Sequence, residues 1–344
     1  MAVFARVAQA DEFATSPVRA GYEAAQHRLL DSDLRTAWEE SGFRWDATYA
    51  GEIFVAPQLT DRFVAAGLFT AELELDFAKL VHASMGAAHV QGLAIHGDGL
   101  TEELMDVHGV SGNVAPPDVR LYEAWYEQPI SAFTLRGGLL AADQEFVLAD
   151  RSTTLLGATF GITSQFSANV IGPVYPVATP GLSGRLELAP VVVRAAIYDG
   201  TQVNDHGIPT QLGPERLVIG EVQLFETFKL GAWHHTDRGY AYYAIADTHI
   251  SDLIGAFTRA GISPDQPVDV YVDGGVRIGP GPLRPDDFIS VGMAYARTEL
   301  GAQITIEASY EAQVRWLTLQ PDVQLVMLRD RTIGVIATRA TVVF

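Results

Sequence analysis

Downstream of Gly42, apolar and polar side chains alternate with a period of two over most of the chain. In the clearest segment, residues 303–314, Ile304 and Ile306 hold one parity while Glu307 and the other polar residues hold the opposite one. Successive side chains of a β-strand point to opposite faces, so this pattern predicts strands with one apolar and one polar face. The same alternation recurs in residues 218–224, 268–276 and 317–325.

The number and spacing of these segments favour a membrane barrel. Residues 43–344 divide into about sixteen strands, an even number, as single-chain bacterial barrels require. Each strand with its connection takes about 19 residues, more than the 8–12 of soluble sandwiches. No run of about 18 apolar residues exists, which excludes membrane-spanning helices and leaves a closed antiparallel barrel as the way to cross a bilayer. The alternative is a soluble all-β protein.

The composition limits the chemistry. The chain carries 23 Lys and Arg against 42 Asp and Glu, a formal charge of −19. Such a surface repels phosphate backbones, so we expect no nucleic acid partner. The chain has no cysteine, and the neighbours His234 and His235 would point to opposite faces of a strand. Phosphate-binding glycine loops and hydrolase motifs are missing as well, so we expect no metal, no cofactor and no enzyme.

The N-terminal 42 residues differ from the rest. Residues 17–42 have apolar positions spaced for one face of a helix, with Gly42 as a stop. We therefore expect residues 1–42 to form an N-terminal helical, periplasmic segment. Residues 1–10 lack a full secretory signal, although Ala8-Gln9-Ala10 resembles a cleavage site, so export is an assumption of the barrel hypothesis.

The composition of the segments between the strands predicts two kinds of connection, short turns and one long loop. Asp199-Gly200, residues 236–239 and residues 329–331 carry residues typical of short turns. Residues 141–181, rich in Gly, Ser, Thr and Pro, form a much longer connection, and loops of this length are usually functional or disordered. In a wide barrel such a loop could fold into the lumen and narrow it. The alternative is a surface loop.

The sequence also predicts how some side chains face and where aromatic residues lie. In residues 268–276 the pattern places Val268 with Val270 on the apolar face, whereas residues 119–128 leave their facing open. The chain ends in a strand whose last residue is Phe344, which is typical of the assembly signal of outer-membrane barrels. Aromatic residues near strand ends are candidates for the interfacial girdles, or for stacking on sugars in the channel: Trp233, Tyr240, Tyr242, Tyr243 and Trp316.

Charged residues recur on the polar parity. Glu72, Glu74 and Asp76 share one strand face and could mimic a glycosidase pair, but a hydrated channel wall explains them more simply. Arg136 and Arg194 lie on polar parity among acidic residues. Opposed charges across a pore would set up a field that orients polar solutes. The alternative is that both arginines are scattered wall residues.

These segments resemble the carbohydrate-selective porins of the OprB family. The resemblance runs from about Leu34 to Phe344, in the order found in the family. The matching segments are Leu34-Arg35 and Gly42 ahead of residues 46–52 (DATYAGE), His96-Gly97, 121–128 (LYEAWYEQ), 135–146 (LRGGLLAADQEF), 175–181 (YPVATPG), 219–223 (IGEVQ), 229–236 (KLGAWHHT) and 316–324 (WLTLQPDVQ).

The resemblance implies a sixteen-stranded bacterial outer-membrane barrel, residues 43–344, that lets small carbohydrates diffuse passively through a polar lumen narrowed by the loop at 141–181. It implies outer-membrane lipid and, through Phe344, the barrel-assembly machinery as partners, with the barrel a monomer or a trimer. A general or cation-preferring porin and a soluble carbohydrate-binding β-domain remain as alternatives. The residues that it implies for the constriction and its lumen neighbours are Arg136, Asp143, Glu145, Arg185, Arg194, Glu221 and Gln223.

Overall fold

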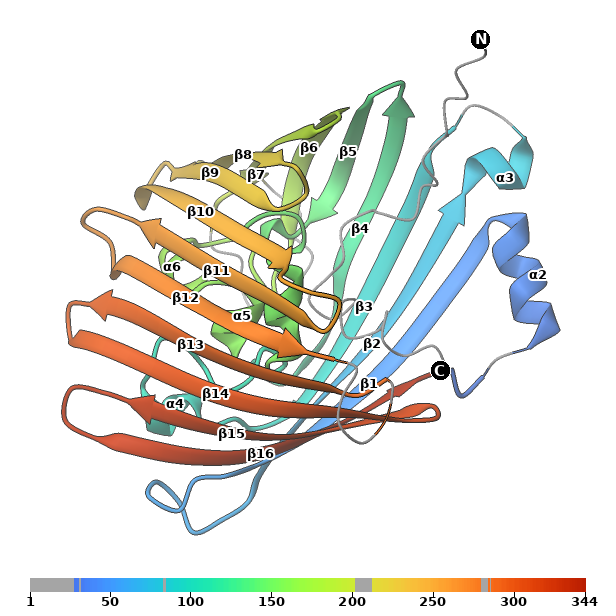
Figure 1. The fold of residues 1–344 in the computed structure, drawn as a ribbon. Helices are drawn as coiled ribbons and strands as arrows, with labels where there is room; N and C mark the ends of the chain where they lie inside the picture. The colour runs from blue at the N-terminus through green and yellow to red at the C-terminus, as the bar shows by residue number, and fades with distance from the viewer. Residues whose placement is uncertain (1–27, 31, 83–84, 202–211, 280–283, 285) are drawn as a thin grey trace.

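Sixteen antiparallel strands form a closed barrel in the computed structural model, which describes residues 28–30, 32–82, 85–201, 212–279, 284 and 286–344 (Figure 1). The strands are β1 (Phe43–Val55), β2 (Val64–Asp76), β3 (Ala87–Gly97), β4 (Asp118–Ile130), β5 (Phe133–Leu140), β6 (Thr179–Leu188), β7 (Val191–Asp199), β8 (Arg216–Leu224), β9 (Phe228–His235), β10 (Gly239–His249), β11 (Ile254–Ile262), β12 (Val268–Ile278), β13 (Phe288–Thr298), β14 (Gly301–Val314), β15 (Leu317–Met327) and β16 (Thr332–Val343).

Each strand pairs with its neighbours in sequence, and the first and last strands close the ring. At this seam β1 pairs with β16 in a register that runs from Thr48 opposite Val343 to Val55 opposite Ile336. The backbone N–H of Phe344 adds one further hydrogen bond, to the carbonyl of Ala47 at 2.9 Å. A closed ring leaves no unpaired strand edge, as a barrel in a membrane requires. The predicted fold and strand number are confirmed.

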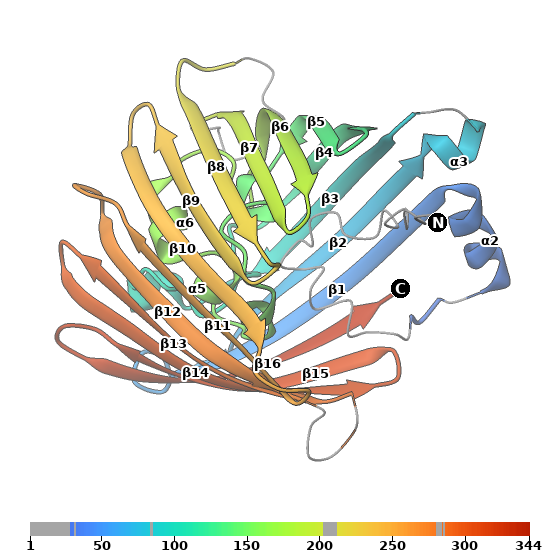
Figure 2. The same cartoon turned by 45° about the horizontal axis from the view of Figure 1, so that its top comes forward.

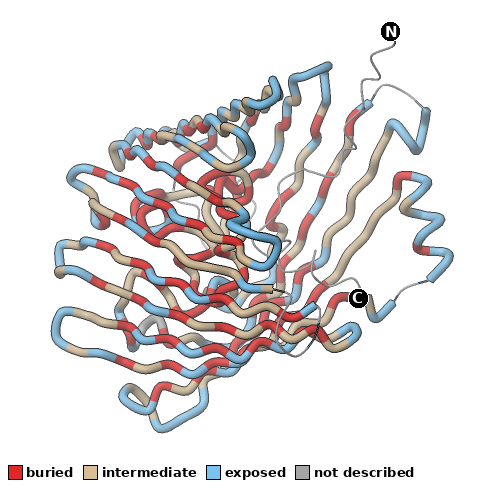
Figure 3. The backbone as a smooth tube through the Cα atoms, in the orientation of Figure 1, coloured by how far each residue is buried: buried red, intermediate tan, exposed pale blue. Residues whose placement is uncertain are grey.

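The two faces of the strands separate as predicted. Along β14 the polar residues Gln303, Thr305 and Glu307 are buried, whereas Ile306 keeps 38% of its surface exposed. Along β15 the lumen-facing Gln320 is buried and Val323 is 52% exposed. Figure 3 shows this alternation of buried and exposed residues along many strands. An apolar outer face and a polar inner face are the reverse of a soluble β-domain.

Two bulges change the facing that period two alone predicts. At the start of β12 the register shifts between Val268 and Val270, so Val268 is buried inside the barrel while Val272 faces outward. The prediction that Val268 lies on the outer face with Val270 is wrong, because the bulge inserts one residue. In β4 the register shifts opposite Gln91 and Gly92, so that Tyr122 and Glu123 both point inward. This bulge explains why the parity of residues 119–128 was ambiguous.

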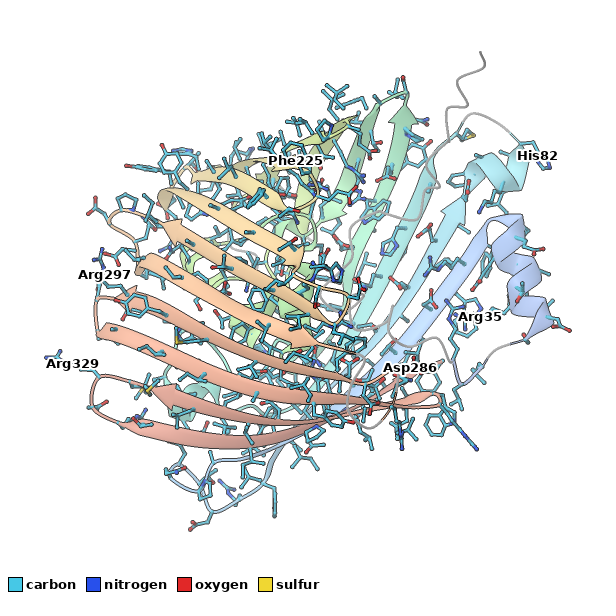
Figure 4. All side chains as sticks on the ribbon, viewed as in Figure 1. Arg35, His82, Phe225, Asp286, Arg297 and Arg329 are labelled. Carbon is cyan, nitrogen blue, oxygen red and sulfur yellow. The ribbon has the colours of Figure 1, made fainter. Side chains whose placement is uncertain are left out.

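The connections divide the barrel into two ends, which Figure 4 marks with His82 and Arg35 at one end and Arg297 and Arg329 at the other. The turns predicted at 236–239 and 329–331 join β9 to β10 and β15 to β16. Asp199-Gly200 is not a two-residue turn, because β8 begins only at Arg216. The predicted loop at 141–181 ends earlier than expected, since Thr179 already belongs to β6.

The N-terminal helix is shorter in the described residues than the sequence predicts. Helix α2 (Asp33–Ser41) begins after Ser32, whose hydroxyl accepts a hydrogen bond from the Arg35 N–H at 3.2 Å. Residues 28–30 are not helical, and residues 17–27 lie outside the described part of the chain. Gly42 ends the helix with φ of 96°, a left-handed conformation that suits glycine. The helix α3 (Phe77–Val81) joins β2 to β3 at the same end of the barrel.

The proposed aromatic residues fall into two groups. Tyr240, Tyr242 and Trp316 are 44%, 56% and 40% exposed, as girdle residues should be. Trp233 and Tyr243 are buried inside the barrel, so the girdle interpretation is wrong for them. No helix among the described residues is both long enough and apolar enough to span a membrane.

Candidate functional site

The connection between β5 and β6 folds into the barrel. It contains the short helices η1 (Ala142–Gln144), η2 (Asp150–Thr154), α5 (Ala158–Gly161) and α6 (Ser164–Asn169), and Figure 2 shows α5 and α6 between the walls of the barrel. Its apolar side chains pack on the wall. The ring of Phe166 lies 6.2 Å from that of Trp233 on β9, and the ring of Phe160 lies 6.3 Å from that of Phe257 on β11. These apolar contacts hold the loop against the wall, so the loop occupies one side of the lumen.

Charged wall residues anchor the same loop. Arg259 on β11 is 1% exposed, and its guanidinium donates to the carbonyl oxygens of Thr159 at 2.8 Å and Phe160 at 3.1 Å. Asp273 on β12 accepts from the same guanidinium at 2.5 Å. On β14, the carboxylate of Glu307 accepts from the backbone N–H groups of Leu156 and Gly157. The charges at these places hold the loop's backbone rather than face open water.

A second segment, residues 98–117 between β3 and β4, also turns inward and includes α4 (Thr101–Leu104). It binds the first loop, since the Gly112 N–H donates to the Leu156 carbonyl at 2.9 Å and the imidazole Nδ1 of His108 lies 2.9 Å from the Ser164 hydroxyl. Burial lowers the pKa of His108 to about 4. The sequence does not predict the inward course of this segment. Its Gly, Asn and Pro residues indicate a loop but not the direction in which it folds.

A cavity of about 220 Å³ lies between these two inward segments and the wall formed by β14, β15, β16, β1 and β2. Because the loop occupies the opposite side of the lumen, this cavity is the candidate passage. Apolar residues of the loop and of β1 and β2 complete its surface. The polar side chains that line it are Thr70, Ser111, Asn113, Asp143, Gln144, Thr153, Ser167, Tyr175, Glu311, Thr318, Gln320, Arg339 and Thr341.

Arg339 and Glu52 form a fixed ion pair beside the cavity. The Arg339 Nε lies 2.5 Å from the Glu52 carboxylate, which is also held by the Ser111 hydroxyl at 2.7 Å and by the Asn113 amide at 3.0 Å. Three parts of the chain meet here, namely β1, β16 and the segment 98–117. Neither residue is among the seven expected at the constriction, although Arg339 stands out as a charge on the polar parity of the last strand.

Asp143 is the one residue of the seven expected at the constriction that lines the cavity. Its carboxylate accepts hydrogen bonds from the Tyr175 N–H at 2.8 Å and from the Tyr122 hydroxyl at 3.3 Å. Burial raises the pKa of Asp143 to about 6. The carboxyl group therefore joins the two ends of the loop at the margin of the passage.

The other six expected residues lie on β5 to β8 and on the start of the loop. Arg194 donates to Gln223 at 2.8 Å and lies 3.4 Å from Glu221. The Glu221 carboxylate also accepts a hydrogen bond from the Val147 N–H at 3.3 Å. Glu221 and Arg194 therefore hold the loop on the side that faces the barrel wall.

Arg136 stacks on the Trp125 ring and donates to Glu127 at 2.8 Å. The Glu145 carboxylate accepts from the Ser183 hydroxyl at 2.6 Å, and Arg185 pairs with Glu187. None of these residues is among those that line the cavity. Their part in the constriction stays a prediction.

A closed sixteen-stranded barrel with an apolar exterior, a polar lumen and an inward-folded loop defines the chain as a porin of the bacterial outer membrane. The model of the family described as carbohydrate-selective porin, OprB family, matches residues 63–243, which is 181 of the 344 residues. The chain belongs to this family, and the resemblance inferred from its sequence is confirmed. It is accordingly a carbohydrate porin.

Solved structures share the fold. The high-pH structure of Pseudomonas putida OprB is 14% identical, with a TM-score of 0.82 over 91% of this chain and 96% of that one. The low-pH structure of the same protein is 15% identical, with a TM-score of 0.60 over 90% and 95%. A mutant of Rh. blastica porin is 11% identical, with a TM-score of 0.58 over 88% and 100%. No curated protein matches the sequence.

Proposed function

We propose that small carbohydrates diffuse passively through the cavity between the two inward segments and the wall from β14 to β2. The observation that carries this proposal is the cavity of about 220 Å³ beside the docked loop, whose lining combines polar and apolar side chains. Hydroxyl, amide and charged groups from opposite sides offer both donors and acceptors to a polyhydroxylated solute. Passage needs contacts that favour entry and are weak enough to permit exit.

We propose that the apolar outer face contacts outer-membrane lipid and that the barrel-assembly machinery recognises the strand ending in Phe344. The barrel would function as a monomer or as a trimer. The division into a periplasmic segment, residues 1–42, and a barrel, residues 43–344, is part of the same proposal. Its support is the position of α2, which packs on β1 at the end of the barrel where the chain ends.

Two threonines on β16 allow a matched test of the passage. Thr341 lines the cavity, whereas Thr338 lies on the exposed outer face. In liposome swelling with glucose, Thr341→Trp should slow entry severalfold because the indole fills the cavity, and Thr338→Trp should match the wild type. Equal swelling of both variants would show that sugars take another route. Wild-type protein that gives neither conductance in planar bilayers nor swelling would overturn the function itself.

A preference for cations is a second candidate, favoured by the acidic lumen. Glu311 and Asp322 point inward and are buried without an ion pair to any described residue, and the whole chain carries −19. Lumen charges of one sign enrich the opposite ion. A zero-current potential measured across a potassium chloride gradient gives the ratio of cation to anion permeability directly.

A further inference from the structure

Glu311 on β14 is a charged residue that the loop does not use. Its side chain lines the cavity and the residue is only 6% exposed. Other lumen carboxylates of this wall are bound, Glu307 by the backbone of the loop and Glu52 by Arg339. Within the described residues, Glu311 forms no hydrogen bond and no ion pair. A buried carboxylate without a partner is costly, unless water or a passing solute takes the place of that partner.

The cations nearest to Glu311 do not neutralise it by contact. Arg339 also lines the cavity, but its guanidinium is already paired with Glu52 at 2.5 Å. Arg277 on β12 attracts Glu311 electrostatically, yet it stacks on the Phe288 ring at 3.7 Å and forms no ion pair with Glu311 among the described residues. The cavity thus presents one carboxylate with free acceptor atoms.

We propose that Glu311 is a specificity-determining residue of the passage, which favours protonated amino sugars and disfavours sugar acids of the same size. This inference rests on the proposed function, because it needs a sugar pathway through this cavity. The ammonium group of a hexosamine can donate to the carboxylate of Glu311. A uronate would bring a second negative charge to the same place. A neutral hexose can only donate hydrogen bonds from its hydroxyl groups to the carboxylate of Glu311.

The size of the effect follows from Coulomb's law. At about 5 Å in water-like surroundings, one unit charge changes the local concentration of an ion about fourfold. Screening at about 0.15 M salt reduces this to about twofold for each sign, so the ratio of cation to anion should change about fourfold. At about 0.01 M salt the Debye length is about 30 Å, and the ratio should exceed about tenfold.

Influx of radiolabelled glucose, glucosamine and glucuronate into proteoliposomes tests the proposal, with equal salt on both sides and near neutral pH, where most of the amine is protonated. In the wild type, glucosamine should enter faster than glucuronate. Glu311→Gln should lower that ratio about fourfold at about 0.15 M salt and more at low salt. Glu299→Gln, the same charge change at an exposed turn between β13 and β14, should leave the ratio at the wild-type value.

The outcomes separate the two claims. The assignment of Glu311 would be overturned if Glu311→Gln left the ratio of glucosamine influx to glucuronate influx unchanged. It would also be overturned if Glu299→Gln lowered this ratio as much as Glu311→Gln does. Both variants should keep wild-type glucose influx, which also shows that they fold. If the wild type admitted no glucose, the proposed function would fail. Discrimination between the two charged sugars that still depended on Glu311 would then support the charge assignment on its own.

Discussion

Replacing Arg259 with methionine should release the loop between β5 and β6 from the lumen wall. The guanidinium of Arg259 holds the carbonyls of Thr159 and Phe160, and it forms a buried ion pair with Asp273. Arg259→Met removes these contacts and leaves the carboxylate of Asp273 buried without its cation. Breaking one side of a buried pair costs about 3–5 kcal/mol. If this whole free energy destabilises the docked state of the loop, the fraction of molecules with an undocked loop rises more than about a hundredfold. Each step of about 1.4 kcal/mol changes an equilibrium constant about tenfold.

Single-channel recording and limited proteolysis would measure this release. We expect larger and noisier conductance for Arg259→Met, together with cleavage within residues 141–178 that the wild type resists. Arg297→Met is the matched control, because Arg297 forms a pair with Asp269 at 2.8 Å on the exposed end of the barrel. Exposed pairs contribute little, so this variant should behave as the wild type.

A double variant separates loss of the loop anchor from the burial of an unpaired charge. Arg259→Met with Asp273→Leu removes both charges, and apolar replacement of a whole buried pair is often neutral. It should recover part of the thermal stability lost in Arg259→Met. Wild-type conductance and protease resistance in Arg259→Met would refute the reasoning, because the loop would then be held by its apolar contacts alone.

Two further perturbations test other parts of the barrel. Burial raises the pKa of Asp143 to about 6 from 3.8, so the folded protein should lose stability as the pH rises from about 4 through about 6. Asp143→Asn should therefore unfold at a higher temperature than the wild type at neutral pH, an advantage that disappears near pH 4; a gain independent of pH would contradict this. Arg35 is 3% exposed and donates to the Phe344 carbonyl at 2.7 Å and to Asp46 at 2.7 Å. Arg35→Ala should lower the temperature at which the barrel unfolds in detergent gels, by removing hydrogen bonds of about 1.5–3 kcal/mol each. Arg44→Ala, which removes a more exposed partner of Asp46, should have a smaller effect.

The passage is the part of the protein that the sequence predicted least well. Of the residues implied by resemblance, Asp143 lines the cavity, whereas Arg194 and Glu221 support the loop from behind. Polar parity shows that a side chain faces the lumen, but it does not show which lumen-facing residues the loop covers. Glu311 and Glu307 have the same parity on one strand, and only the docked loop makes one an anchor and leaves the other without a partner.

By itself, the sequence determined the strands, their two faces and the closed barrel, because alternation with period two is a property of adjacent residues. It also fixed the family, through ordered segments that a family model confirms over residues 63–243. The tertiary structure alone decided the bulges at Tyr122 and Val268, the second inward segment and the course of the long loop. These depend on contacts between distant residues, such as that of Leu156 with Glu307, which are 151 positions apart, and no local pattern records them.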